Sequence, residues 1–517
     1  MTQQAIDEPD VQEVSTGRLR KGLRRFDVFF LLLCSLVGLD TIGALAASGP
    51  EAFTWLLVFS VLFFVPYGLI VSELSATFPF EGGQYTWVRM AFGRFVASVA
   101  QFVYWLSNPV WVGGALAVVA LATFQTFILP LPGMWTYVFG LAFIWAGVLA
   151  VSISLKAGRW VPIAGATARI ILLGFFFVST VVYGFIHGVQ PLAASDFSPS
   201  YLGFLALAPL IVFTFVGFEV SSAAAEEMEA PQRSIPLGVL RSGLTAFVMV
   251  ALPIAAILIV LPRDQVSHLS GFLDAAKLVF TIYGGHVGPD GTVELTGAGE
   301  VIGVMCAVGV IVALFTSGVS WAMGESRAQA TACSDGSGPA WLGQISERFG
   351  TPVRINVLAG VLATAVMVAA LNFTAGDIGK YFSVGLNLAI SMTMVAYLVM
   401  FPALLVLDRK YPDANRPFRI PGGTVGRVLC SGAATLVVVF TLIQLLYPGA
   451  GLGLFGSPGT PDDALPSGFT GDRLGYELGQ LVPMAVFVAM GIGSYLIGQR
   501  ETRRGRNRSQ AVDQLTV

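Results

Sequence analysis

Long apolar runs recur along almost the whole chain, and they limit the fold more than any other feature of the sequence. Each run is about 18 residues or longer, which is enough to cross the hydrocarbon core of a bilayer as a helix. Of the 517 residues, 55% are hydrophobic and only 12% are charged, which excludes a water-soluble core. Backbone groups inside a bilayer must pair within the protein, so these runs form helices. The sequence therefore predicts an all-α, polytopic membrane protein.

Polar interruptions between the runs predict twelve transmembrane helices. The first six are expected at 26–48, 52–76, 96–128, 134–155, 160–187 and 202–224. The second six are expected at 237–262, 299–325, 353–371, 379–407, 426–447 and 477–498. Tails are expected at 1–25 and 499–517, and a short amphipathic helix at 339–349, where apolar residues recur at helical spacing.

Basic residues give an independent test of this division. Twelve spans place all but four of the 29 Lys and Arg residues on one side of the membrane. The exceptions are Arg263, Lys277, Lys380 and Arg473. Short loops rich in Lys and Arg face the cytoplasm, so we expect both termini to be cytoplasmic and the protein to lie in the plasma membrane.

The span at 202–224 does not resemble a plain anchor. Gly217 interrupts its apolar run, and Glu219 follows two residues later. A charged side chain near the middle of a bilayer costs roughly 2.5 to 3.5 kcal/mol on insertion scales, so such a residue indicates a functional site. We expect the helix to break at Gly217, and the freed backbone groups to line a polar cavity with Glu219. The alternative is structural: Glu219 only hydrogen-bonds a neighbouring helix.

The first span repeats this pattern, because Asp40 follows Gly38 by two residues. Interrupted spans at corresponding positions of two halves indicate the binding site of a transporter. Broken helices offer positive N-termini to anions and carbonyl groups to cations. The residues expected to bind substrate are Gly38, Leu39, Asp40, Thr41, Ile42, Gly43, Phe213, Phe215, Val216, Gly217, Phe218 and Glu219. A cap on a half-helix N-terminus is the alternative role for Asp40.

The third span supplies a further candidate wall for this site. Trp105, Asn108 and Trp111 follow one another at intervals of three residues, and residues three or four apart share a helix face. We expect Asn108 and Trp111 to contact the substrate. Simple aromatic packing is the alternative.

Several motifs are absent from the sequence. None of the five lysines is followed by Ser or Thr, so there is no phosphate-binding loop and ATP is not the expected energy source. There is no G-x-S-x-G nucleophile motif, which disfavours an enzyme. The three histidines and four cysteines are scattered, so we expect no metal site, disulfide framework or cofactor.

Three segments resemble signatures of the amino acid, polyamine and organocation permease superfamily, and the resemblance covers nearly the whole chain. The segments are FTFVGFEVSSAAAEEMEAPQRSIP (Phe213 to Pro236), SELSATFPFEGGQYTWV (Ser72 to Val88) and GESRAQATACSDG (Gly324 to Gly336). The resemblance implies the leucine-transporter type of fold, with two inverted halves of five spans at 26–187 and 202–407. It also implies peripheral spans within 426–498 and alternating access around the two broken helices.

The same resemblance implies roles for individual residues. Phe213 matches an aromatic residue that covers the substrate from outside, and Glu219 matches a glutamate implicated in gating or proton coupling; Asp40 is expected to share in that role. Arg169 lies where many relatives have a lysine whose charge substitutes for a sodium ion. Arginine does not deprotonate in proteins, so this position could hold charge but hardly carry a proton. Snorkelling to the inner interface is the alternative for Arg169.

The first span departs from the family pattern, because GLDTIG replaces a G-S-G-type break that receives a substrate carboxylate. An anionic Asp40 would repel a carboxylate and attract an amine; the segment is similar to the acidic first span of plant-type polyamine transporters. We expect a secondary transporter of an amino acid, amine or polyamine, coupled to protons or to exchange. An amine-conducting channel and a non-transporting receptor or scaffold are the alternatives.

Expected partners are a small-molecule substrate and membrane lipid, not nucleic acid; a homodimer is compatible with the sequence.

Overall fold

The computed structural model of the chain describes residues 25–153, 160–228, 230–261, 271–289, 291–373, 378–454, 459–466 and 468–515. The expected N-terminal tail, residues 1–25, lies outside this part except for its last residue. All statements about the structure below refer to the described residues.

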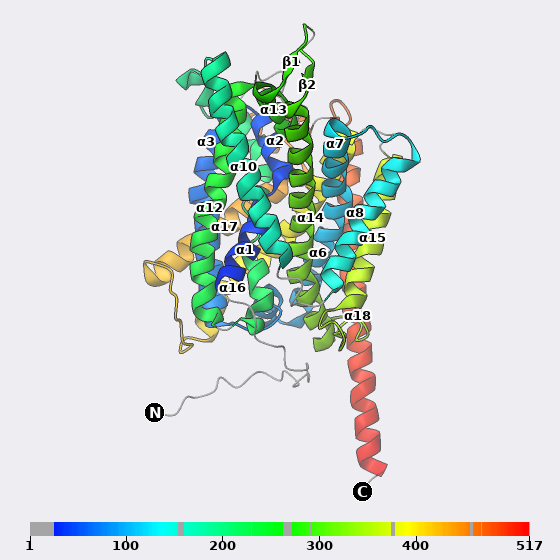
Figure 1. Cartoon of the computed structure of the whole chain (residues 1–517). Coiled ribbons are helices and arrows are strands. Elements are labelled where there is room, and N and C mark those ends of the chain that lie inside the picture. Colours follow the sequence, from blue (N-terminus) through cyan, green and yellow to red (C-terminus); the bar gives the residue numbers. More distant parts are fainter. Residues whose placement is uncertain are drawn as a thin grey trace.

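Nearly parallel helices make up the molecule (Figure 1). Eleven helices of the described part are long and apolar enough to cross a bilayer. Interrupted spans are α1–α2 (Arg25–Leu36, Leu39–Ala47), α3–α4 (Pro50–Phe59, Val65–Thr77), α6–α7 (Arg94–Trp111, Ala117–Phe127) and α11–η4 (Tyr201–Thr214, Phe218–Glu227). Continuous spans are α8 (Met134–Ser152), α10 (Trp160–His187), α12 (Pro231–Val260), α14 (Ala298–Ala332), α16 (Ile378–Lys410), α17 (Gly423–Leu446) and α18 (Arg473–Leu515).

These helices confirm the all-α polytopic class. The helix α15, Val353–Phe373, lies where the ninth span was expected and is not counted among these eleven. The count of twelve and the inverted repeat therefore stay predictions.

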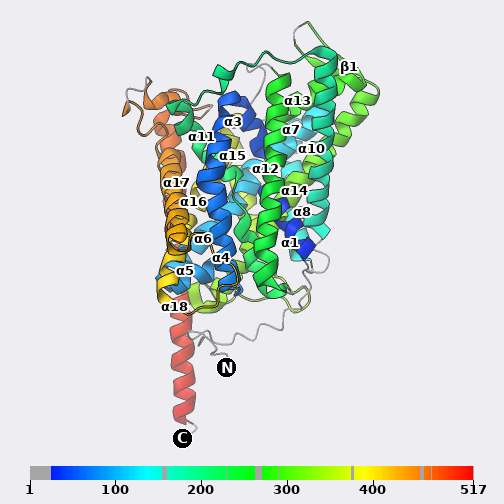
Figure 2. The ribbon, with the colours of Figure 1, turned by 90° about the vertical axis from the view of Figure 1, so that its left-hand side faces the viewer.

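Helix α6 lies inside the bundle and contacts α5 (Gln84–Phe92), α14, α15, α16 and α18. Helices α8 and α10 instead expose large apolar side chains, as a lipid-facing surface requires. Figure 2 shows that α18 extends beyond the bundle at the end opposite β1. The protein core is thus formed by the interrupted spans and by α14 and α16.

A compact segment between α12 and α14 covers one end of the first span. It consists of α13 (Gly271–Phe280) and the antiparallel hairpin β1 (Gly285–Val287) and β2 (Val293–Leu295) (Figure 1). A Cβ atom on Gly43 would lie 3.1 Å from the backbone nitrogen of Phe272, so α13 packs directly on α2. The sequence analysis placed this segment between the expected spans 237–262 and 299–325 and predicted no helix or strand in it.

The amphipathic helix expected at 339–349 is absent, and that expectation was wrong. The segment forms turns, in which the Leu342 N–H donates to the Pro339 carbonyl at 3.0 Å. The Gly343 carbonyl accepts from Ser334 Oγ at 2.8 Å, and the Trp341 carbonyl accepts from Arg354 Nη1 at 2.8 Å. Because neighbouring side chains engage these carbonyl groups, the backbone does not need helical hydrogen bonds.

Two of the segments that resemble the permease superfamily lie side by side. Tyr85 of α5 bonds to Asp335, and its hydroxyl lies 2.8 Å from Ser337 Oγ. Arg89 and Arg94 pair with the same aspartate at 3.1 and 3.2 Å. Burial, and then the charge of Asp335, raise the pKa of the Tyr85 hydroxyl, so it remains a donor at neutral pH. These contacts join α5 to the end of α14.

A buried ionic cluster joins α4 to the segments after α16. Glu73 accepts from Arg427 Nε at 2.7 Å and from the Ile420 N–H at 2.8 Å, and it pairs with Arg416 at 3.4 Å. Asp408 pairs with both arginines at 3.0 Å. Because Glu73 is fully buried, removing its charge would leave two arginines without full compensation.

We therefore expect Glu73→Gln to lower the free energy of unfolding by about 3–5 kcal/mol. The matched control is Asp462→Asn, because Asp462 pairs with Arg473 at 2.5 Å but its side chain is 58% exposed. An exposed pair contributes less than about 1 kcal/mol. Denaturation of both purified variants in detergent checks this. Equal losses would show that the inner cluster does not stabilise the bundle.

Candidate functional site

The span at 202–224 is broken where the sequence predicted it. Helix α11 ends at Thr214, and the 3-10 segment η4 begins at Phe218. Gly217 between them has a φ of 134°, which favours glycine. A Cβ atom on Gly217 would lie 3.2 Å from the carbonyl carbon of Ser35. The break therefore places the backbone of this span directly against the first span.

The first span is broken as well. Helix α1 ends at Leu36, α2 begins at Leu39, and Gly38 between them is extended, with φ −83° and ψ 118°. The break frees carbonyl groups at the end of α1, which side chains of α10 and α14 then satisfy. The contacts are Ser317 Oγ to the Cys34 oxygen at 3.2 Å, Trp321 Nε1 to the Ser35 oxygen at 3.0 Å and Arg169 Nε to the Val37 oxygen at 2.9 Å.

Arg169 places a fixed positive charge at this break. Its side chain is completely buried, which does not fit a side chain that snorkels to the interface. Nη1 donates to Thr316 Oγ1 at 3.1 Å and to Cys34 Sγ at 3.2 Å. Nη2 donates to Ser317 Oγ at 2.5 Å and to the Ala313 carbonyl. All these hydrogen-bond acceptors are neutral, and the acidic side chain of Asp40 lies within electrostatic range of the guanidinium.

Glu219 accepts hydrogen bonds from three tyrosines on three different spans. Tyr104 of α6 and Tyr397 of α16 donate to Oε1 at 2.6 and 2.5 Å. Tyr67 of α4 donates to Oε2. Both carboxylate oxygens therefore accept hydrogen bonds, and these bonds connect the broken span to α4, α6 and α16. This network favours a role for Glu219 in holding helices together.

The Tyr67 hydroxyl also satisfies the break itself. It accepts from the N–H groups of Gly217 and Phe218 at 3.1 and 3.0 Å, and it lies 3.0 Å from the Tyr397 hydroxyl. Backbone N–H groups freed inside a membrane need such an acceptor. One side chain thus serves both the interrupted backbone and the adjacent carboxylate.

Asp40 is bound differently from Glu219. It lies in the first turn of α2 and is only 3% exposed, and Gly38, not Asp40, is the N-cap residue. Trp111 Nε1 donates to Asp40 Oδ2 at 2.9 Å. No described residue is a hydrogen-bond partner of Oδ1. An unpartnered carboxylate oxygen inside a protein is costly, so it can accept from a ligand.

Aromatic rings surround the tryptophan that holds Asp40. The Trp111 ring meets Phe213 at 5.8 Å and Trp321 at 5.9 Å between centroids, both edge-on. The faces of such rings attract a cation, and their carbon atoms pack against an apolar stem. Phe213, predicted to cover the substrate, is thus adjacent to the side chain that contacts Asp40.

The other predicted residues of the two breaks pack more than they bind. Phe215 and Phe218 stack on Phe64 at 4.6 and 4.9 Å. Thr41 Oγ1 donates to the Gly38 carbonyl at 3.2 Å. Leu39, Ile42 and Val216 are buried apolar residues, and Gly43 lies against α13. Their positions around the breaks fit a supporting role.

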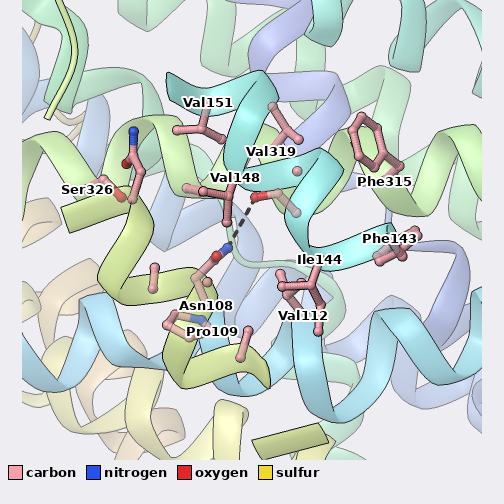
Figure 3. A pocket seen from close by; sticks show the side chains of 17 residues that line it. Asn108, Pro109, Val112, Phe143, Ile144, Val148, Val151, Phe315, Val319 and Ser326 are labelled. Carbon is pink, nitrogen blue, oxygen red and sulfur yellow. Dashed lines mark hydrogen bonds between the residues drawn. The ribbon is translucent and has the colours of Figure 1, made fainter. Parts of the chain in front are cut away.

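Asn108 lines a different space from Asp40. It faces a cavity of about 40 Å³ between α6, α8, α14 and α15, and its amide donates to the Gly318 carbonyl at 3.3 Å (Figure 3). The lining is apolar except for Asn108, Ser326 and Asn356. The remaining predicted wall residue, Trp105, packs edge-on against Phe102 at 5.6 Å. Of the three third-span residues that the sequence singled out, Trp105, Asn108 and Trp111, only Trp111 contacts a carboxylate.

The carboxylate site is a better candidate for substrate than this cavity. A volume of about 40 Å³ holds about three water molecules, since each needs roughly 10–15 Å³ on this measure. Its lining contains no charged side chain. A buried cation requires an opposite charge, which Asp40 supplies and the cavity does not.

Sequence reasoning missed five contributors to the site. They are Tyr67, Tyr104, Tyr397, Trp321 and Glu325. Helical spacing could have found Tyr104, seven residues before Trp111 on the same face of α6. Glu325, a buried acid of α14 that accepts from Ser107 Oγ at 3.4 Å, could have been found as an acid at the end of an apolar run. The other three have no local signal.

Comparisons with known proteins show the family of the chain. Residues 23–458 match the family described as amino acid permease. An uncharacterised transporter of Legionella pneumophila is 30% identical over 82% of this chain and 89% of its own length. A probable agmatine/putrescine antiporter of Lactococcus lactis is 26% identical over 84% of this chain and 91% of its own. A glutamate/gamma-aminobutyrate antiporter of the same species is 25% identical over 84% and 85%.

The tyrosine network gives a prediction about stability. Tyr67→Phe would leave two backbone N–H groups and Glu219 Oε2 without a partner, each costing about 1–3 kcal/mol. Tyr397→Phe is the matched control, because Glu219 Oε1 keeps its bond from Tyr104, so we expect a loss of only about 1 kcal/mol. Chemical denaturation in detergent measures both. If Tyr397→Phe proves as damaging as Tyr67→Phe, the break does not depend on the Tyr67 hydroxyl.

Proposed function

The chain belongs to the amino acid permease family, and on that premise we propose that it exchanges cationic amines bound at Asp40. The protein is a multi-pass membrane protein and a secondary transporter of amino acids or amines, not an enzyme. The substrate class, the residues that bind it and the coupling are the proposed part.

The unpartnered oxygen of Asp40 is the observation that carries this proposal. A buried carboxylate that lacks a cation is unfavourable, and an ammonium or guanidinium group removes that cost. The rings of Trp111, Phe213 and Trp321 lie beside this site, and a cation over the face of one of them would gain roughly 0.5–2 kcal/mol. A substrate carboxylate at the same place would be repelled by Asp40.

The names of the relatives support exchange. Two of the relatives above are named as antiporters, one a probable antiporter of agmatine and putrescine and the other an antiporter of glutamate and gamma-aminobutyrate. Their identities to this chain are nearly equal, so similarity alone does not choose between amines and amino acids. The acid in the first break favours the amines.

Arg169 supports coupling without sodium. Its guanidinium donates to the Val37 carbonyl and to the hydroxyls of Thr316 and Ser317, oxygens of the kind that would coordinate a cation between spans 1 and 8. Because arginine keeps its charge, this position holds a permanent cation and does not carry a proton. Exchange of one amine for another then needs no added ion.

We propose alternating access between the halves 26–187 and 202–407, with Glu219 and its tyrosines as the joint that rearranges. Phe213 would cover the substrate from outside. The plasma membrane is the proposed location, with both termini in the cytoplasm, because all but four of the 29 basic residues then face inward.

Asp40→Asn tests the substrate class. We expect it to raise the half-saturating concentrations of putrescine and agmatine about tenfold or more. The half-saturating concentrations of neutral amino acids should change little, because only a cationic substrate loses its ion pair. Exposed Asp413→Asn is the matched control. Competition against labelled substrate in proteoliposomes measures both variants. Equal losses for cationic and neutral compounds would assign Asp40 a structural role.

A second test concerns coupling. Proteoliposomes loaded with unlabelled putrescine are expected to take up labelled putrescine at the same rate in sodium and in choline buffer, because Arg169 already supplies the charge. Empty vesicles are the control, and uptake should be far lower without internal amine. Accumulation driven by a sodium gradient in empty vesicles would contradict sodium-independent exchange.

A further inference from the structure

We propose that Glu325 is a second anionic anchor of the substrate site, so that Asp40 and Glu325 hold the two cationic ends of a diamine. This inference rests on the proposed amine exchange and names its substrate class more narrowly. The sequence analysis did not identify Glu325, and no role considered above uses it.

One face of α6 connects three buried acids. Tyr104 donates to Glu219 at 2.6 Å. Ser107, three residues later, donates to Glu325 at 3.4 Å, and Trp111, four residues further, donates to Asp40 at 2.9 Å. Residues at these intervals share one helix face. The three carboxylates, which come from α14 and from the two breaks, therefore converge on α6.

The acids differ in how fully their oxygens are engaged. Both oxygens of Glu219 accept from tyrosines. Asp40 and Glu325 each have one engaged oxygen, whereas no described residue is a partner of Asp40 Oδ1 or Glu325 Oε2. Glu325 is only 1% exposed, so bulk water does not satisfy Oε2. Two open acceptors in one protein core fit a ligand with two donors.

An aromatic surface lies between these two acceptors. Trp321 precedes Glu325 by one helical turn on α14, so both side chains project from the same face. The Trp321 ring lies 5.9 Å from Trp111, which holds Asp40, and 6.4 Å from Tyr104. Rings in this position suit the methylene chain between two ammonium groups.

Length and charge both favour a short diamine. Helix α6 rises about 6 Å between Ser107 and Trp111, the side chains that hold the two acids, and a short diamine spans a distance of this order. Three buried carboxyl groups and one buried guanidinium, Arg169, lie in this core, and two of the carboxyl groups have an open oxygen. A diamine can pair with both open oxygens, whereas a monoamine pairs with only one.

The test compares putrescine with butylamine, which has the same carbon chain and lacks one amine. Half-saturation is measured by competition against labelled putrescine exchange in proteoliposomes. For Glu325→Gln we expect the half-saturating concentration of putrescine to rise about tenfold. That of butylamine should rise less than about threefold, because only putrescine loses an ion pair. Glu300→Gln, an exposed acid on the same helix, is the matched control and should change neither value.

A proportional change for both amines, or no change for either, would overturn the role of Glu325. Exchange of putrescine by the unaltered protein would still stand in that case, so the two failures are distinguishable. If the unaltered protein transports neither amine, the proposed function fails first. Glu325→Asp gives a second test should Glu325→Gln not fold: its shorter side chain should shift the preference from putrescine towards the longer cadaverine. An unchanged preference would also overturn the inference.

Discussion

The hydroxyl of Tyr67 is the contact on which the rest of the site depends. It accepts from the N–H groups of Gly217 and Phe218 and donates to Glu219, so one side chain compensates the backbone that the break leaves unpaired and also fixes the adjacent carboxylate. Without this compensation a helix interruption inside a bilayer would be costly. Because the break brings Gly217 against Ser35, it also sets the position of the first span.

Charge in the core follows from the two breaks. Arg169 satisfies the carbonyl end of α1, and Asp40 lies at the start of α2, so both charged groups border the same interruption. Glu219 is saturated by hydroxyl groups, whereas Asp40 keeps an open oxygen beside aromatic rings. Binding and structural support are therefore divided between two acids that look equivalent in sequence. A cationic substrate completes the arrangement that the protein leaves open.

The sequence alone predicted the helical membrane fold and both breaks, because these depend on apolar length, glycine and local spacing. It left two interpretations of Arg169 open, a charge in place of sodium and a side chain that reaches the interface. Only the fold shows that the side chain is buried at the break. Tyr67 and Tyr397 are 152 and 178 residues away from Glu219, so no local pattern reveals their contact with it. The turns at 339–349 were missed because side chains of Ser334 and Arg354 take the carbonyl groups that a helix would use.

An experimental structure with a bound amine tests the central claim most directly. Cryo-electron microscopy of the protein in nanodiscs with saturating putrescine is expected to show one nitrogen within hydrogen-bond distance of Asp40 Oδ1, between spans that are broken at Gly38 and Gly217. Density for the amine elsewhere, for example in the cavity beside Asn108, with Asp40 untouched, would contradict the account. Continuous helices through both positions would contradict it as well.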